Sequence, residues 1–442
     1  MASTRLTRSI TGSNAKKATL SFWIKRGALG GSAYVLFTNR IDASNDTLVR
    51  FTSDLIDFKD YQSGSNVGRL ETTQVFRDIS AWYHIVISID TTLGTADDRQ
   101  KMYVNGEQIT SFASRTNYPQ DTVLNINKTG TMEIGANNGA DYFDGLMSYF
   151  AFVDGTAYDA SYFGETNTAT GIWKIKTAPS VTYGTNGFFL KMDTSSPGTD
   201  TSGNSNTFTA SGTPTLTQDN ASNNFATLNT LTYQAASQSN SGTIRAYNGN
   251  TTWKSQGSNQ WGTIFSTIAP STGKWYFEVK VGAVGGNAIV GVVDAADARA
   301  NTATEWYIGQ SSTGQGYQNN GSASNGGASY GATYTTGDII GCAMDLDNSK
   351  IYWSKNGTFQ NSGVPTSGAT GTGALTLTAN TNYAFAVTGY NTTTMNCNFG
   401  NGFFGTTAVA SSNADAAGHG LMEYAVPTGY FTLNTKNLNT YG

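Results

Sequence analysis

The sequence predicts an all-β protein made of two antiparallel β-sandwich domains, jelly-roll-like in form, with a connector rich in Gly, Ser, Thr and Asn. Apolar and polar residues alternate in short runs separated by turn residues, which is typical of strands. Helix-disfavouring residues interrupt nearly every window in which a 3.6-residue period could run. The 442 residues suffice to bury two cores of ordinary domain size. We therefore expect little helix and two separate sandwiches.

The first sandwich is predicted over residues 1–165. In residues 82–90, Tyr83 and three isoleucines share one face, while the other face is mainly polar, as in a half-buried strand. A polar loop follows, and residues 101–107 then form a strand that contains the Asn105-Gly106 turn. Two strands joined in this way are expected to form a hairpin.

Residues 166–239 are predicted to connect the two sandwiches. The stretch 193–206 contains too little apolar surface for a core strand and consists mainly of turn-forming residues. Short apolar runs at 187–192 and 207–210 flank this stretch. We expect them to form short strands that pack against one of the sandwiches.

The second sandwich is predicted over residues 240–412. Residues 336–357 indicate a strand, a polar turn, a second strand and the Asn356-Gly357 turn, which is a strong hairpin signal. Residues 413–442 are expected to form an extended C-terminal tail, because Pro427 disfavours a central strand there.

Both halves resemble families of binding domains. The hairpin at 336–357, with residues 273–281, 289–293 and 383–387, resembles the SPRY domain, a β-sandwich that binds other molecules through its loops. The first half resembles the laminin-G or concanavalin A-like lectin sandwich. The segments that carry this second resemblance are residues 20–25, 82–86, 102–106, 133–135 and 143–147.

The order of lectin-like sandwich, connector, SPRY-like sandwich and tail resembles virion proteins of tailed bacteriophages, especially fibre and receptor-binding types. The resemblance implies a structural protein of the virion, assembled in the host cytoplasm and exposed on the particle. It would serve as a tail-fibre or head-fibre adhesin that attaches to the host. Head, tail fibre and baseplate all stay open as its location.

The same resemblance implies the partners. They are other virion proteins and a bacterial surface glycan or protein bound through the sandwich loops, without catalysis. Fibre proteins are commonly symmetric, so we expect a homo-oligomer, with a trimer favoured. Two alternatives stay open, namely a purely structural protein that decorates the capsid or joins fibres, and a polysaccharide depolymerase.

Charge and hydropathy argue against two classes of partner. A net charge of −4 and a pI near 5.3 give no basic surface for nucleic acid. No run of 18 apolar residues occurs, so membrane insertion is not expected. The N-terminal residues lack the apolar run of a signal peptide, and we expect a soluble protein that is not exported by that route.

The sequence does not predict an enzyme. His84 and His419 are the only histidines, and no nucleophile is evidently paired with either. A glycosidase needs two carboxylates across the sugar. Asp54, Asp57 and Asp60 form the best acidic cluster, but a spacing of three does not place them on one face of a strand.

No cofactor is predicted, although calcium is a weak possibility. Asp42, Asp46, Asn137 and Asp141 lie in loops and offer the oxygen ligands that calcium prefers. Alternatively, these residues form turns through hydrogen bonds from side chain to backbone. Neither loop has the spacing of a dedicated calcium motif.

Cys342 and Cys397 each lie on an alternating strand and are expected to point inward as free thiols. A bridge between them stays open if their strands are neighbours.

The ligand-binding candidates come from the SPRY resemblance, because loops between SPRY strands form the recognition surface. Residues 305–321 are rich in aromatic rings and amides, which suit sugars. The alternative places Trp306 and Tyr317 in the core and leaves only the asparagines facing water. The candidates are Trp306, Tyr317, Asn319, Asn320 and Tyr330.

Overall fold

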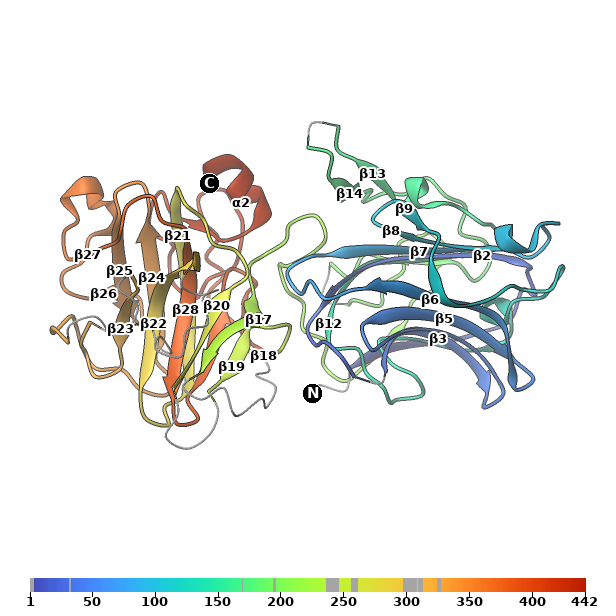
Figure 1. The fold of residues 1–442 in the computed structure, drawn as a ribbon, viewed down its shortest axis with the longest axis horizontal. Coiled ribbons are helices and arrows are strands. Elements are labelled where there is room, and N and C mark those ends of the chain that lie inside the picture. Colours follow the sequence, from blue (N-terminus) through green and yellow to red (C-terminus); the bar gives the residue numbers. More distant parts are fainter. Residues whose placement is uncertain are drawn as a thin grey trace. The chain divides into compact units, whose positions relative to one another are not determined.

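The computed structural model describes residues 4–31, 33–168, 170–193, 196–235, 246–255, 261–296, 308, 313–323 and 327–442. The chain divides into two compact units, each with its own core (Figure 1). The first comprises Met1–Leu216 and Asn220–Ser222, and the second comprises Thr217–Asp219 and Asn223–Gly442. Nearly all regular structure is strand, and neighbouring strands are almost entirely antiparallel, which confirms the predicted all-β fold.

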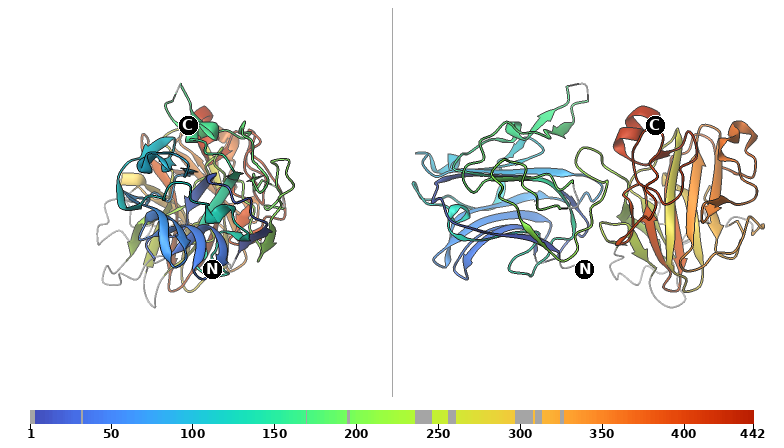
Figure 2. Two further views of the ribbon diagram at one scale, coloured as in Figure 1. Left: turned by 90° about the vertical axis from the view of Figure 1, so that its right-hand side faces the viewer. Right: turned by 180° about the vertical axis from the view of Figure 1, so that it is seen from behind.

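Two curved sheets form the first unit (Figures 1 and 2). The order in the eight-stranded sheet is β10 (Phe112–Thr116), β6 (Ser65–Val75), β5 (Leu55–Gln62), β4 (Asn45–Thr52), β3 (Tyr34–Asp42), β11 (Gly130–Ile134), β1 (Arg5–Ile10) and β16 (Thr209–Ser211). The order in the six-stranded sheet is β15 (Phe188–Leu190), β12 (Gly145–Asp154), β2 (Lys17–Arg26), β7 (Tyr83–Asp90), β8 (Gln100–Val104) and β9 (Glu107–Ile109).

The core of the first unit lies between these sheets and is rich in aromatic rings. Phe22 stacks on Phe150 with ring centroids 4.8 Å apart, and Phe37 lies 5.8 Å from Phe150. All three side chains are fully buried. Alternation along β2, β7 and β12 sends every second side chain to this core and its neighbours to the outer face.

A second, smaller apolar layer covers the outer face of the six-stranded sheet. Side chains from residues 155–168 and 170–189 pack there on β12 and β7, and the layer includes Val86, Val153 and Phe189. The hairpin β13 (Gly164–Thr166) and β14 (Trp173–Ile175) belongs to this covering segment (Figure 1). Short 3-10 turns complete the unit: η1 (Ala96–Asp98), η2 (Asn125–Asn127) and η3 (Ala160–Tyr162).

Residues 166–239, expected as one connector, are divided between the units. β15 pairs with β12 and β16 pairs with β1, so both extend sheets of the first sandwich. β17 (Leu228–Ala235) instead pairs with β20 (Trp261–Ser266) of the second unit. Each short strand satisfies its backbone hydrogen bonds by adding to an existing sheet edge, which the local sequence does not reveal.

The second unit also contains two packed sheets. The five-stranded sheet has the order β17, β20, β28 (Tyr383–Tyr390), β22 (Ala288–Asp294) and β23 (Gln315–Gln318). The nine-stranded sheet follows the path β18 (Ala246–Tyr247), β19 (Thr252–Lys254), β29 (Thr394–Asn398), β21 (Lys274–Ala283), β24 (Ile339–Asp345), β25 (Lys350–Lys355) and β26 (Thr358–Phe359), with β27 (Leu375–Thr376) beside β25 and β32 (Phe431–Thr432) beside β21.

The core between these sheets contains three fully buried tryptophans, Trp253, Trp275 and Trp353. Phe277 packs against Phe385 with centroids 4.2 Å apart. The remaining short elements are the 3-10 turn η5 (Pro365–Thr370) and the pair β30 (Phe403–Phe404) and β31 (Thr407–Ala408).

The C-terminal segment is not the extended tail that was expected. It contributes β32 to the nine-stranded sheet and ends in helix α2 (Thr435–Tyr441). Met422 and Tyr430 pack on Tyr276 and Tyr352, so the segment covers the outer face of this sheet. Pro427 lies outside β32, as its missing N–H requires.

The two cysteines are buried and free. Cys342 on β24 pairs with Phe277, and Cys397 on β29 pairs with Val279, so β21 lies between them. Their strands are therefore not neighbours, and a bridge is prevented. In the described residues, no helix combines the length and apolar character needed to span a membrane.

Candidate functional site

The structure places the SPRY-like candidate tyrosines in the core. Tyr317 is 0% and Tyr330 is 4% exposed, and their ring centroids lie 5.5 Å apart. The Tyr317 hydroxyl donates to Ala332 O, and burial raises the pKa of Tyr317 to about 12. Tyr330 lies edge-on to Trp353. Both rings are thus used in packing, which corrects the expectation that they face a ligand, while Trp306 lies outside the described residues.

The two candidate asparagines follow β23 and lie in its turn. Asn319 is partly buried and accepts the backbone N–H of Ala288 at 3.0 Å through its side chain. Asn320 is exposed, and its Oδ1 accepts both the N–H and the hydroxyl of Ser322. The Asn320 Nδ2 group is the part of this turn that could donate to a ligand.

A serine and a histidine that the sequence did not pair meet on the outer face of the six-stranded sheet. Ser21 Oγ lies 2.9 Å from His84 Nε2, and Trp173 Nε1 donates to His84 Nδ1 at 3.0 Å. Because Nδ1 accepts, Nε2 carries the proton and donates to Ser21. The ring therefore cannot remove a proton from this serine. Burial also lowers the pKa of His84 to about 3.

The acidic cluster of the first unit is divided among separate partners. Asp54 pairs with Arg26 and Arg77, both at 2.9 Å. Asp57 is buried between Arg50 and Arg69. The three carboxylates therefore do not converge on one substrate position.

Asp60 and Glu278 are the described carboxyls with the most strongly raised pKa values. Burial raises the pKa of Asp60 to about 6, although Asn125 N and Tyr118 Oη donate to it. Burial raises the pKa of Glu278 to about 7. Glu278 accepts the N–H groups of the C-terminal segment at Glu423 and Tyr424, so this carboxyl holds that segment in place.

The four calcium candidates do not share one loop: Asp42 ends β3, Asp46 is buried on β4, and Asn137 and Asp141 lie near a separate turn. Asp42 accepts from Ser44 N and the Asn45 side chain. Asn137 and Ala140 exchange backbone hydrogen bonds in a tight turn, and the Asp141 carbonyl accepts from Val35 N. Burial raises the pKa of Asp46. Within the described part of the chain, no three His, Cys, Asp or Glu side chains gather where they could hold a metal ion.

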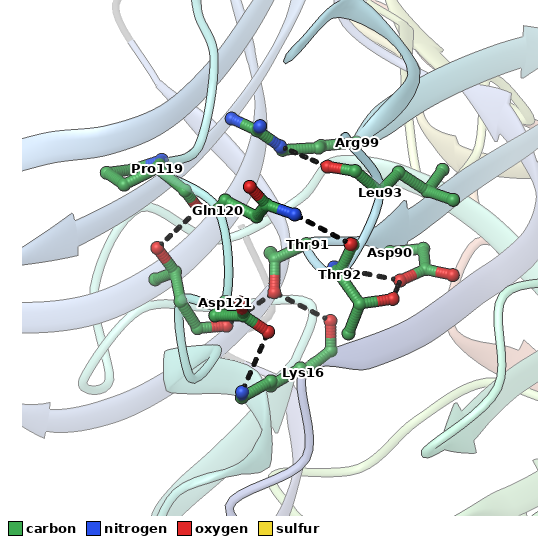
Figure 3. A network of polar contacts seen from close by, with 10 residues as sticks. Lys16, Asp90, Thr91, Thr92, Leu93, Arg99, Pro119, Gln120 and Asp121 are labelled. Carbon is green, nitrogen blue, oxygen red and sulfur yellow. Dashed lines mark hydrogen bonds and ion pairs between the residues drawn. The ribbon is translucent and has the colours of Figure 1, made fainter. Parts of the chain in front are cut away.

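One loop rim of the first unit is fixed by polar contacts (Figure 3). Arg99 donates to the carbonyls of Leu93, Gly94 and Tyr118, each at 2.8 Å. Thr91 donates to carbonyls on two other segments, at Lys16 and Thr122. These contacts tie the loop after β7 to residues 117–124 and to the chain before β2. Such a rigid rim can present exposed polar groups to a ligand with little loss of entropy.

A group of tyrosines on the outer apolar layer was not predicted from the sequence. Four of the 23 tyrosines fall between residues 149 and 183, which is the signal that could have revealed it. Tyr149 and Tyr183 are half-buried, and each has its ring centroid 6.0 Å from that of Phe189. Tyr158 and the exposed Tyr162 lie 4.4 Å apart in the same layer.

Each of the two sandwiches matches a known protein family. Residues 3–160 match the concanavalin A-like lectin/glucanases superfamily, and residues 274–397 match the SPRY domain. The chain therefore contains one domain of each type, as the sequence analysis expected. Domains of these types typically serve in binding.

The curated relatives match only a short segment. The chain is 36% identical over 95 residues to the "Ran-binding proteins 9/10 homolog" of Drosophila melanogaster and 33% identical to "Ran-binding protein 9" of Homo sapiens. The matches cover 20% of this chain and 10% and 12% of those proteins. The chain thus spans only a small part of the relatives' length.

Solved structures show weak overall likeness. The SPRY domain of human HERC1 has 14% identity and a TM-score of 0.29, covering 38% of this chain and 96% of that one. The heptameric SAP-like pentraxin from Limulus polyphemus has 16% identity and a TM-score of 0.26, covering 35% of this chain and 70% of the other.

Proposed function

We propose that this chain is a binding protein without catalysis, in which two β-sandwiches each present a surface to a partner. The observation that carries the proposal is the pairing of a lectin-type domain with a SPRY domain. A second observation supports it: side chains of types that often act in catalysis make structural hydrogen bonds here. His84 accepts a hydrogen bond from Trp173, and Glu278 accepts one from the backbone of the C-terminal segment.

The two domains would have different partners. The lectin-type sandwich would bind glycan. Aromatic rings stack on sugars, and hydroxyl and amide groups form hydrogen bonds with them, so a surface of these groups suits a sugar better than a surface of charged side chains does. The SPRY sandwich would bind a protein, a role supported by the SPRY match and by the similarity of 95 residues of this chain to proteins named for binding Ran. Only the general role of protein binding is carried over.

The biological setting that we propose is the virion of a tailed bacteriophage, on a tail or head fibre. Its support is the resemblance in domain order, together with the low charged content of 13% and the 51 glycines. The lectin-type sandwich would attach to a bacterial surface glycan, and the SPRY sandwich would hold the chain to another virion protein. A homo-oligomer, with a trimer favoured, would present several copies to the host surface.

Two measurements test this proposal. Gold-labelled antibody against the chain should mark purified virions at fibres in electron micrographs, and the purified protein should bind bacterial glycans on an array. Labelled virions without glycan or cell binding would favour the purely structural alternative. Reducing ends released from host polysaccharide would favour the depolymerase. Absence from virions would contradict the virion setting.

A further inference from the structure

We propose that Tyr149 and Tyr183 form a subsite for a neutral pyranose chain on the outer face of the six-stranded sheet. The inference rests on the proposed glycan-binding function and assigns it to the outer apolar layer of the first unit. It starts from the backbone of β12, which carries a register shift between Ser148 and Ala151 where it pairs with β2.

Tyr149 lies in this β-bulge and has a φ of +52°. A left-handed backbone is costly for a bulky L-residue and persists only where its surroundings determine it. Bulges redirect side chains, and this one lets Phe150 enter the core while Tyr149 joins the outer layer. The strand thus keeps a costly conformation at the position that brings this ring to the outer surface.

Two tyrosine rings lie against one phenylalanine at this position. Phe189 is buried, and Tyr149 and Tyr183 are partly buried with their ring centroids each 6.0 Å from it. Tyr183 is close to parallel with Phe189, with 19° between the ring planes, and Tyr149 is tilted by 42°. The position therefore offers two partly accessible rings that pack on a common buried ring. The apolar faces of pyranoses stack on such rings, because the ring face is negative and the sugar C–H groups are positive.

The chemistry around the rings favours a neutral sugar. Burial raises the pKa of Tyr149 and of Tyr183, with further contributions from Asp193 and Asp200, respectively. Both phenols therefore stay protonated and can donate to sugar oxygens. Asp193 is exposed and can accept from sugar hydroxyls, whereas its charge would repel an anionic sugar.

Neighbouring tyrosines extend the same surface. Tyr158 accepts the N–H of Thr182 through its hydroxyl at 3.3 Å, which ties it to the segment that holds Tyr183. Tyr162, 42% exposed, packs against Tyr158. A chain of several sugar units could therefore continue from Tyr183 toward Tyr162, which favours a polysaccharide over a single monosaccharide.

Affinity gel electrophoresis of the full chain tests the subsite, with β-glucan, galactomannan or dextran in the gel and polygalacturonate as the anionic comparison. We expect at least one neutral polymer to retard the wild-type protein and polygalacturonate to retard it much less. Tyr149→Ala and Tyr183→Ala should each weaken binding roughly tenfold, and the double variant should abolish it. Tyr247→Ala, which removes a 44% exposed ring in the second unit, is the matched control and should bind normally.

Tyr149→Phe and Tyr183→Phe keep the rings and protect the test against misfolding. They should retain the wild-type melting temperature and bind more weakly than wild type by a few-fold, because only the hydroxyl is lost. Neutral-polymer binding that is unchanged in all five variants at Tyr149 and Tyr183 would overturn the subsite and leave the adhesin proposal supported. Retardation by polygalacturonate alone, or by no polymer, would also overturn the subsite, while the array and virion labelling judge the adhesin proposal independently.

Discussion

Trp275 has no exposed surface, and its indole Nε1 donates to Thr272 O at 2.7 Å. Trp275, Phe277 and Val279 occupy every second position of residues 273–281, and this alternation predicts that their side chains point inward. The same kind of pattern could not place Tyr317, because a tyrosine after a polar loop suits either a core or a ligand surface. At the scale of the residue, burial is decided by what packs on the ring from other strands.

Replacing Trp275 with alanine should remove one of the three largest side chains of the second core. We expect the free energy of unfolding to fall by about 3–5 kcal/mol, since the cavity cannot fully collapse. Chemical denaturation followed by circular dichroism measures this loss. Trp173→Ala, on the outer layer of the first unit, is the comparison and should cost less because Trp173 is only partly buried. An unchanged midpoint for Trp275→Ala would refute the placement.

The asparagine turn after β23 gives a second prediction at this scale. Asn320→Ala should weaken binding to the SPRY-side partner by about 0.5–1.5 kcal/mol, because the exposed Nδ2 donor is lost. It should also lower stability, since Ser322 loses its acceptor. Asn319→Ala should lower stability by a similar amount with little loss of binding, since Ala288 N loses its side-chain acceptor. Partner binding therefore separates the two roles. Normal partner binding by Asn320→Ala would remove this turn from the proposed surface.

At the scale of elements, the place of a short strand in the fold depends on the sheet with which it pairs. β15 and β16 come from a stretch that the sequence indicated as connector, yet each completes a sheet edge of the first sandwich. The hairpin of β13 and β14 has few residues, and its attachment depends on Trp173 and His84. An element held by so few contacts should open before the rest of the unit.

Acid should release this hairpin. Burial lowers the pKa of His84 from 6.5 to about 3, so the unfolded chain binds a proton that the folded chain excludes. The stabilisation is fully present above pH 6.5 and is lost as the pH falls toward 3, at up to ~1.4 kcal/mol per pH unit. A protonated ring would also direct an N–H at the Trp173 N–H. Hydrogen exchange of residues 164–175, corrected for intrinsic rates, should therefore increase as the pH falls.

His84→Gln provides the control, because an amide keeps a donor and an acceptor but does not titrate. Its hairpin should show no matching dependence on pH. Asp60 titrates in the opposite sense, since its folded pKa is raised from 3.8 to about 6, and it is present in both proteins. Their difference at each pH therefore isolates His84. Equal acid responses of the two proteins would contradict the assignment.

At the scale of the whole molecule, each unit has its own core and its own set of sheets. Chains of this kind commonly unfold in more than one step. We expect calorimetry to show two transitions, with Trp275→Ala lowering only the one that belongs to the second unit. Far-ultraviolet circular dichroism should show much less helix than the globular average of about one third. A single transition shifted as a whole by Trp275→Ala would contradict independent units.

The sequence by itself determined the fold class and the two sandwiches, because alternation and Asn-Gly turns are local signals, and its resemblance to known families indicated the domain types. It also indicated which faces of residues 82–90 and 273–281 enter a core. The tertiary structure decided that the connector is divided between the two units, that the C-terminal segment packs on the nine-stranded sheet, and that Tyr317 and Tyr330 are buried. Only the tertiary structure showed that Tyr149 and Tyr183 pack on the same phenylalanine. These features depend on contacts between segments far apart in the chain, and no local pattern encodes which distant strand will cover or expose a given ring.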